Sequence, residues 1–274
     1  MSDHDHCLQS LRIADRDLYL ASLLIPNDYR SDITALYAFN AEIARVRDVV
    51  SEALPGEIRL QWWRDAISTS SEEARANPLA NILLDVIEKY DLPRESFDKM
   101  LLARAFDLYD DPMPNQNDLE GYAGETTSLL FQLASLIAGA DQSSKLADAC
   151  GHAGVAYVLM QIVRDLPRHA SRGQLYLPAE LLKKSGAERE RILNGEMHEG
   201  LANALSEMSA LCREHRKKAQ QAIHELPDNV QPVFLPLALI ELYLKKQEKQ
   251  GFNPFKDRAH LSQLRAQWVL WRAT

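Results

Sequence analysis

The sequence predicts a single all-α domain, and three observations support this prediction. Apolar residues recur at helical spacing along most of the chain. The clearest stripe is formed by Leu79, Ile82, Leu83, Val86, Ile87 and Tyr90. No alternation of apolar and polar residues is long enough to predict a sheet. No break between helical segments combines length with low complexity, so we find neither a domain linker nor an internal repeat.

Turn-forming residues set the order of the predicted helices. Pro, Gly, Asn and Asp interrupt the helical pattern and divide the chain into roughly eight to ten helices joined by short loops. The interruptions fall at 26–27, 55–56, 77–78, 91–93, 110–117, 172–173, 178, 227–229 and 251–254. The most apolar stretches, 128–139 and 233–244, are shorter than the roughly 20 residues of a membrane span, so we expect buried helices and no transmembrane segment. We expect residues 1–16 to be a flexible N-terminus without a secretory signal, and residues 17–274 to form the domain.

The composition argues against several classes of protein. The 39 acidic and 31 basic residues give a formal charge of −8, whereas a protein that binds nucleic acid needs a basic face to displace counterions. We therefore expect no nucleic-acid partner. Cys7, Cys150 and Cys212 are an odd number at wide spacings, which favours neither a disulfide framework nor a structural zinc site and indicates a reducing cytoplasm.

Three segments carry a family resemblance. The first is LLIP at 23–26, followed by Arg30 and by ALYAF at 35–39; the second is IVRD at 162–165, and the third is GQLYLP at 173–178. In that order and at those separations they resemble the squalene/phytoene synthase family. The resemblance extends from about residue 17 to about residue 244. It implies an isoprenoid-synthase-like helical bundle around a central cavity.

The family also implies two Asp-x-x-x-Asp motifs that face each other across the cavity mouth and hold magnesium ions against a diphosphate. The first motif falls on residues 44–48, where only Asp48 is acidic and Arg45 stands at a carboxylate position. The second falls on residues 165–169, where only Asp165 is acidic. Because a guanidinium repels a divalent cation, we expect no catalytic residue, no metal and no cofactor. If the chain were active, Asp48 and Asp165 would hold magnesium.

Other positions of the same alignment leave alternatives open. The glycines that follow the family's central tyrosine, here Tyr122, fall on bulkier residues at 127–130, which we expect to narrow the cavity. Asp48 and Glu52 lie four residues apart and form an alternative acidic pair if the helix register is shifted. The arginines beside the two carboxylates could form salt bridges that replace the metal or could bind an anion; they are Arg45, Arg47, Arg164 and Arg168. The candidate cavity or diphosphate contacts are Tyr37, Arg45, Tyr122, Gln161, Arg164, Arg168 and Tyr176.

Two longer segments point to one branch of the family. The segments LYAFNAEIARVRDVVSE at 36–52 and GEIRLQWWRDAI at 56–67 are similar to the mitochondrial assembly factor for respiratory complex I and its bacterial relatives. This branch implies a non-catalytic protein in complex I assembly, with a respiratory-complex subunit or an isoprenoid or other lipid as its partner. A peripheral contact with the inner membrane is compatible with that role. The alternative is an active enzyme that joins two farnesyl or geranylgeranyl diphosphates head to head.

Four tryptophans lie in two helical segments. Trp62 and Trp63 are adjacent, so we expect one in the core and the other beneath a neighbouring helix or free for a partner. Trp268 and Trp271 form an amphipathic patch with Leu264 near the C-terminus. We expect this patch to dock back on the domain, and a membrane or partner contact is the alternative.

Two further local features yield expectations. Pro167 predicts that the helix before it ends or kinks at Leu166. The segment DHDHC at 3–7 has side chains that can bind metals, but no second cluster completes a coordination sphere. We therefore expect a frayed terminus there.

Overall fold

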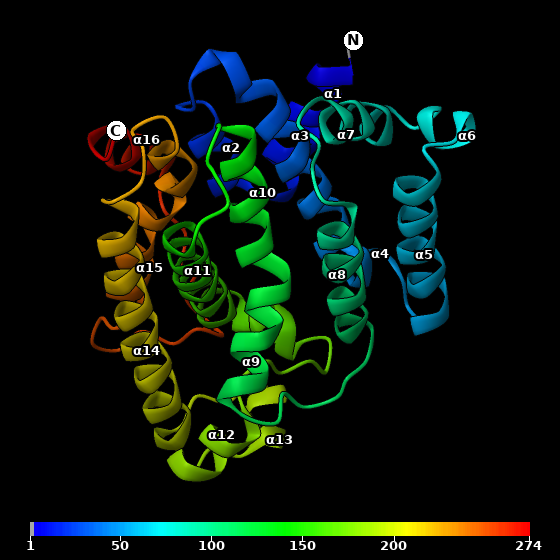
Figure 1. Ribbon diagram of the computed structural model, residues 1–274. Helices are drawn as coiled ribbons and strands as arrows, with labels where there is room; N and C mark the ends of the chain where they lie inside the picture. Colours follow the sequence, from blue (N-terminus) through cyan, green and yellow to red (C-terminus); the bar gives the residue numbers. More distant parts are fainter. Residues whose placement is uncertain (1–2) are drawn as a thin grey trace.

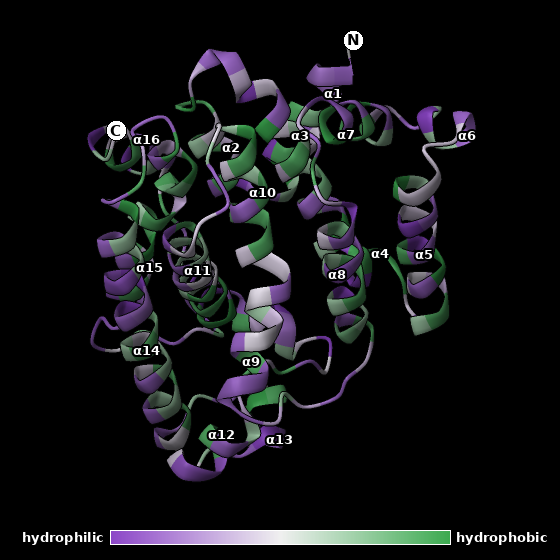
Figure 2. Cartoon of the chain, viewed as in Figure 1, coloured by the Kyte–Doolittle hydropathy of each residue, from purple (hydrophilic) through white to green (hydrophobic). Residues whose placement is uncertain are grey.

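A computed structural model describes residues 3–274, and these residues form helices and loops without a β-strand. Figure 1 shows the helices arranged as a bundle, with α10 (Leu129–Ile137) and α11 (Ser144–Ala170) in the middle and α14 (Glu199–Ile223) along one side. In Figure 2, α10 is largely hydrophobic, whereas α14 alternates hydrophobic and hydrophilic residues along its length. The all-α prediction is confirmed.

The N-terminal segment differs from the expectation for residues 1–16. Residues 3–14 form helix α1 (Asp3–Ala14), which packs against α3 (Asn27–Ala44) and α7 (Pro78–Lys89). Cys7 and Leu11 lie four residues apart on one face of α1 and are both buried. Burial of that face outweighs the fraying of a terminal helix. Residues 1–2 of the expected flexible segment lie outside the described residues.

The helices are shorter and more numerous than predicted. Side-chain caps divide segments that the helical pattern predicts as one helix. Asp15 is an example: it accepts hydrogen bonds from the backbone N–H groups of Asp17 and Leu18 and so separates α1 from α2. The remaining elements of the first half are α2 (Arg16–Ser22), α4 (Val46–Val49), α5 (Ala53–Thr69), α6 (Glu72–Arg75), α8 (Arg94–Arg104), η1 (Ala105–Leu108) and α9 (Gln116–Ala123). Those of the second half are α12 (Ala179–Ser185), α13 (Arg189–Leu193), η3 (Gln231–Leu239), α15 (Ile240–Gln247) and α16 (Gln263–Arg272).

Helix α11 is the central element of the fold. It is 27 residues long, and by length and composition alone it could cross a membrane; 72% of its most apolar window is buried against the rest of the domain, as in a core helix. The sequence prediction had considered only the shorter apolar stretches. Pro167 does not end the helix at Leu166, because α11 continues to Ala170. Pro167 has no backbone N–H, so the carbonyl four residues earlier loses its usual helical donor, but only the last turn of α11 lies beyond this point.

A close helix contact lies beside the cavity. At Gly154 of α11, an added Cβ would lie 2.4 Å from the backbone nitrogen of Ser128. Ser128 ends the π-helical turn η2 (Gly124–Ser128), and two of the residues at 127–130, Thr127 and Leu130, line the cavity. The close approach thus depends on a glycine of α11 rather than on glycines at 127–130.

Candidate functional site

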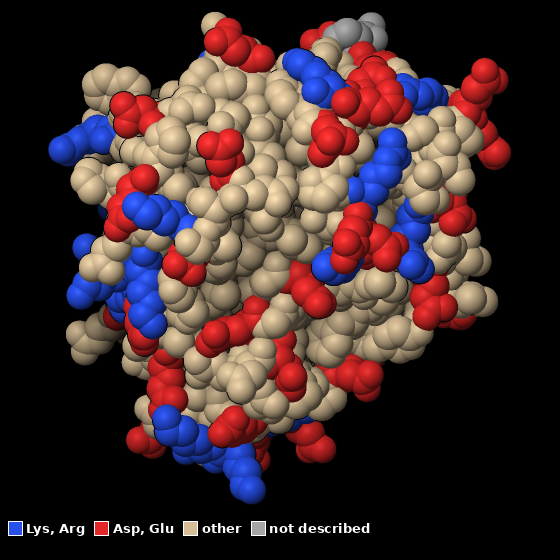
Figure 3. Space-filling model, viewed as in Figure 1, with Lys and Arg blue, Asp and Glu red and all other residues tan. Residues whose placement is uncertain are grey.

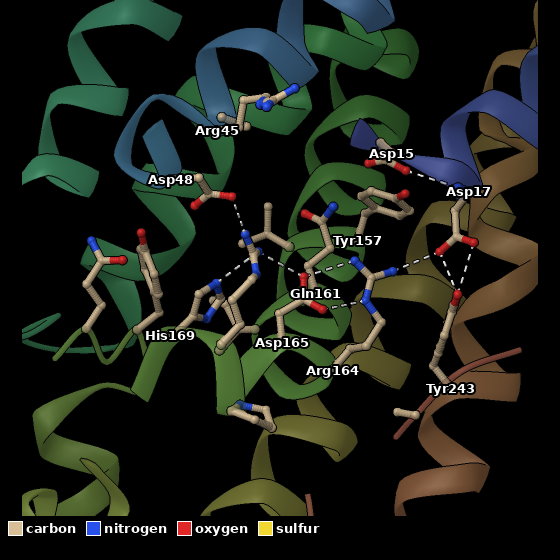
Figure 4. A pocket seen from close by; sticks show the side chains of 18 of the residues that line it. Asp15, Asp17, Arg45, Asp48, Tyr157, Gln161, Arg164, Asp165, His169 and Tyr243 are labelled. Carbon is tan, nitrogen blue, oxygen red and sulfur yellow. Dashed lines mark hydrogen bonds and ion pairs between the residues drawn. The ribbon is translucent and has the colours of Figure 1, made fainter. Parts of the chain in front are cut away.

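A cavity of about 890 Å³ opens among the helices. Its walls come from the C-terminal end of α3, from η1, from residues 157–169 of α11, and from the loop at 252–260. Figure 3 shows acidic and basic side chains intermixed on one face of the molecule. Figure 4 shows that charged groups from facing helices meet inside the cavity.

Arg168 joins Asp48 and Asp165 across the cavity mouth. Its Nη1 atom donates to Asp48 Oδ2 at 3.0 Å, and its Nη2 atom donates to Asp165 Oδ2 at 3.2 Å. Arg172 donates to the other oxygen of Asp48. Asp48 belongs to the short helix α4, whereas the other three residues lie in or directly after α11, so the bridge ties two elements that are far apart in the chain.

A second arginine organises the inner part of the cavity. Arg164 donates to both oxygens of Asp165, at 2.8 and 3.0 Å, and to Asp17 of α2 at 2.8 Å (Figure 4). The hydroxyl of Tyr243 also donates to Asp17, at 2.8 Å. Burial alone would raise the pKa of Asp165, but the ion pair with Arg164 outweighs burial and lowers this pKa to about 2. Nearby, burial and the charge of Asp17 raise the pKa of Asp15 to about 6.

These contacts do not fit the magnesium ions that the family implies. All four carboxylate oxygens of Asp48 and Asp165 accept hydrogen bonds from guanidinium groups. Magnesium needs oxygen ligands in near-octahedral geometry, and a guanidinium between two such ligands repels it. Within residues 3–274, no group of three or more His, Cys, Asp or Glu side chains is arranged to hold a metal ion. Burial and the charge of Arg168 lower the pKa of His169 to about 4, so this side chain is neutral near pH 7.

A third cluster of polar side chains lies in the wall of the cavity. Asp107 accepts hydrogen bonds from the hydroxyls of Tyr122 at 2.8 Å and Tyr176 at 2.7 Å, and pairs with Arg104 at 3.2 Å. The Arg104 and Asp107 side chains are only 11% and 7% exposed. Burial and the charge of Asp107 raise the pKa of Tyr176 well above its usual value, so the hydroxyl stays protonated and serves as a donor.

The structure places most of the predicted site residues in one cavity. The predicted residues that line it are Arg45, Asp48, Tyr122, Gln161, Arg164, Asp165, Arg168 and Tyr176. The prediction for Tyr37 is wrong: its side chain is fully buried away from the cavity, and its hydroxyl donates to the carbonyl of Val233 at 3.2 Å. Arg45 lines the rim, but in Figure 4 it points away from the ion pairs around Asp165.

The alternative acidic pair is also excluded by the backbone. Helix α4 ends at Val49, and Glu52 is the residue before α5, so Asp48 and Glu52 do not share one helix. Several further residues line the cavity that the sequence does not predict, because no local pattern distinguishes them from surface charges or core aromatics. These are Asp15, Asp17, Arg104, Asp107, Tyr157 and Tyr243.

Comparison with known proteins agrees with this architecture. The sequence profile described as "Squalene/phytoene synthase" matches residues 11–272. The chain belongs to the squalene/phytoene synthase family. The family resemblance drawn from the sequence motifs is therefore confirmed.

Among family relatives, the human protein named "NADH dehydrogenase (ubiquinone) complex I, assembly factor 6" is 30% identical over 255 residues, covering 93% of this chain and 76% of that protein. "Phytoene synthase 1, chloroplastic" of Arabidopsis thaliana is 23% identical over 268 residues, covering 96% of this chain and 64% of that protein. The chain is thus similar both to a protein named as an assembly factor and to a protein named as a synthase.

Solved structures confirm the fold class. A dehydrosqualene synthase in complex with ligand superposes with a TM-score of 0.84 at 17% identity, covering 99% of this chain and 95% of that one. Squalene synthase HpnC from Alicyclobacillus acidocaldarius superposes with a TM-score of 0.77 at 19% identity, covering 92% and 95% of the two chains. At these identities the likeness concerns the fold alone.

Proposed function

We propose that this chain is a non-catalytic member of the squalene/phytoene synthase family that acts in the assembly of respiratory complex I. One observation carries the non-catalytic part: guanidinium groups engage every carboxylate oxygen of Asp48 and Asp165, at the positions where the family's motifs would hold magnesium. Without that metal, nothing at the mouth neutralises a departing diphosphate in the family's manner. The assembly part is supported by the similarity to proteins named as complex I assembly factors.

The cavity in this proposal binds a ligand without converting it. Its volume of about 890 Å³ suits a sizeable ligand, and its wall combines charged groups with apolar side chains such as Leu130, Val158 and Ile162. An isoprenoid or other lipid with a polar end matches this mixture, because its apolar part and its head would each find suitable contacts.

An enzymatic assay tests the non-catalytic part. Purified protein is mixed with farnesyl or geranylgeranyl diphosphate and millimolar magnesium, and pyrophosphate release is followed, with an active family synthase as the positive control. We expect no release above the protein-free rate. Turnover that is lost in a D48N/D165N double variant would instead establish the prenyltransferase alternative.

Complementation of a deletion strain tests the assembly part. We expect loss of the chain to lower complex I activity and the wild-type chain to restore it. Compared at equal amounts of folded protein, the D48N/D165N variant should also restore it, because catalysis is not involved; chemical unfolding of the variant measures separately the stability lost with the ion pairs. Normal complex I activity in the deletion strain would contradict the assembly role.

A further inference from the structure

The C-terminal helix α16 is apolar on two opposite faces. Ala266 and Leu270 are buried, and through this side α16 packs against η3 and α2. Leu264, Trp268 and Trp271 recur at i, i+4 and i+7, so they form one stripe on the opposite face. Their side chains are 80%, 55% and 65% exposed. The expectation that this patch docks on the domain is therefore wrong, because the smaller face docks and the tryptophans project outward.

The segment that carries this stripe has only basic charged side chains. Residues 258–274 contain three arginines and no Asp or Glu, although the whole chain carries a formal charge of −8. Arg265 and Arg272 each follow a stripe residue directly, so both flank the stripe on the same side. The Arg272 guanidinium lies 5.0 Å from the centre of the Trp268 ring. Within residues 3–274, neither Arg258 nor Arg265 takes part in an ion pair.

From this arrangement we infer that α16 is an interfacial helix that binds the surface of a membrane containing anionic lipids. Tryptophan rings favour the headgroup region, where the indole N–H stays hydrated while the ring leaves water. Arginines beside them can pair with lipid phosphates. The stripe projects from the domain as a ridge of three large side chains, and a soft lipid surface accepts such a ridge without a matching groove. This inference does not depend on the assembly role.

The position of α16 relates such a membrane to the cavity. The loop at 252–260 lines the cavity rim, and α16 begins at Gln263, only three residues later. Arg16 of α2 donates to the carbonyl of Leu261 at 3.2 Å and contacts His260 at 2.9 Å, which fixes the loop against the domain. Ile13, which is 81% exposed, lies on the same rim. A membrane bound by α16 would therefore lie beside the cavity mouth, where an apolar ligand could pass between the two.

Vesicle co-sedimentation tests the inference with the full chain. Vesicles of phosphatidylcholine alone are compared with vesicles that also contain phosphatidylglycerol. We expect binding to the anionic vesicles and a blue shift of tryptophan fluorescence. The W268Q/W271Q variant should lose at least about fivefold in partitioning, because two rings no longer leave water. The R265Q/R272Q variant should bind anionic vesicles more weakly, and its binding should depend less on salt. Its binding to vesicles of phosphatidylcholine alone should not change.

The matched control replaces two apolar residues with similar exposure elsewhere on the surface. Leu54 and Ile58 of α5 are 63% and 62% exposed, and L54Q/I58Q should bind vesicles like the wild type. Circular dichroism checks that all variants keep their helices. Equal binding by W268Q/W271Q and the wild type, or no vesicle binding by the wild type, would overturn the inference. A third result would also overturn it: light scattering shows a wild-type dimer, only W268Q/W271Q abolishes that dimer, and no protein binds vesicles. The stripe would then bind a second copy of the chain.

Discussion

Replacing Arg168 with Met removes the guanidinium that joins Asp48 to Asp165, and we expect the free energy of unfolding to fall by about 1–2 kcal/mol. The distance from Arg168 Nη1 to Asp48 Oδ2 is 3.0 Å. Two unit charges at this distance attract by about 1.4 kcal/mol in water and about 5.5 kcal/mol at an effective dielectric constant of 20. The Arg168 side chain is 45% exposed, so solvent screening places the net contribution near the lower figure.

A double-mutant cycle measures this interaction separately from the loss of side-chain packing. Urea unfolding of R168M, D48N and the double variant should give a coupling energy of about 0.5–1.5 kcal/mol, and the coupling should shrink in high salt. Arg191 provides a matched control, because it is 43% exposed and contacts Glu188 and Glu196 but joins only residues close in the chain. We expect R191M to cost less than about 0.5 kcal/mol. A coupling energy of zero between Arg168 and Asp48 would refute the bridge.

The remaining predictions concern groups around the cavity, each measured by chemical unfolding. Asp107→Ala should cost about 3–5 kcal/mol, because it leaves the buried guanidinium of Arg104 without its carboxylate; an effect below 1 kcal/mol would contradict the cluster. Gly154→Ala should cost about 2–3 kcal/mol through its clash with the neighbouring backbone, whereas Gly151→Ala, which has nothing within 4 Å, should stabilise helix α11 by about 0.5–1 kcal/mol. The pKa of His169 falls from 6.5 to about 4 on folding, so its contribution to stability is present above pH 6.5 and is lost as the pH falls toward 4. His169→Gln should therefore reduce the loss of stability between pH 7 and pH 4.5 by about 2–3 kcal/mol, and an unchanged pH dependence would argue against a buried neutral imidazole.

The sequence predicted the features that depend on local pattern. Helical periodicity gave the all-α class, and ordered motifs identified the family before any contact was known. The same motifs predicted Asp48 and Asp165 as site residues, and both line the cavity. The predictions of the fold class and the family hold because spacing along a helix determines which side chains share a face.

Contacts between distant segments could not be predicted in the same way. Asp48 and Arg168 are 120 residues apart, and Asp17 and Arg164 are 147 apart, so their pairing depends on how the helices pack. The sequence is compatible with arginines that form salt bridges and with arginines that bind an anion, and the distances show ion pairs for Arg164 and Arg168. Helix α16 illustrates a different limit: a helix with apolar residues on two faces does not reveal by periodicity which face is buried.

The bridge through Arg168 also determines when the two sides of the cavity mouth come together. If bound metal ions held the two sides of such an entrance together, the closed fraction would depend on the concentrations of the ions and of the ligand that binds with them. Arg168 is part of the chain, so folding alone fixes its effective concentration at Asp48 and Asp165. In this structure the two sides of the entrance are thus held together by side chains of the protein itself.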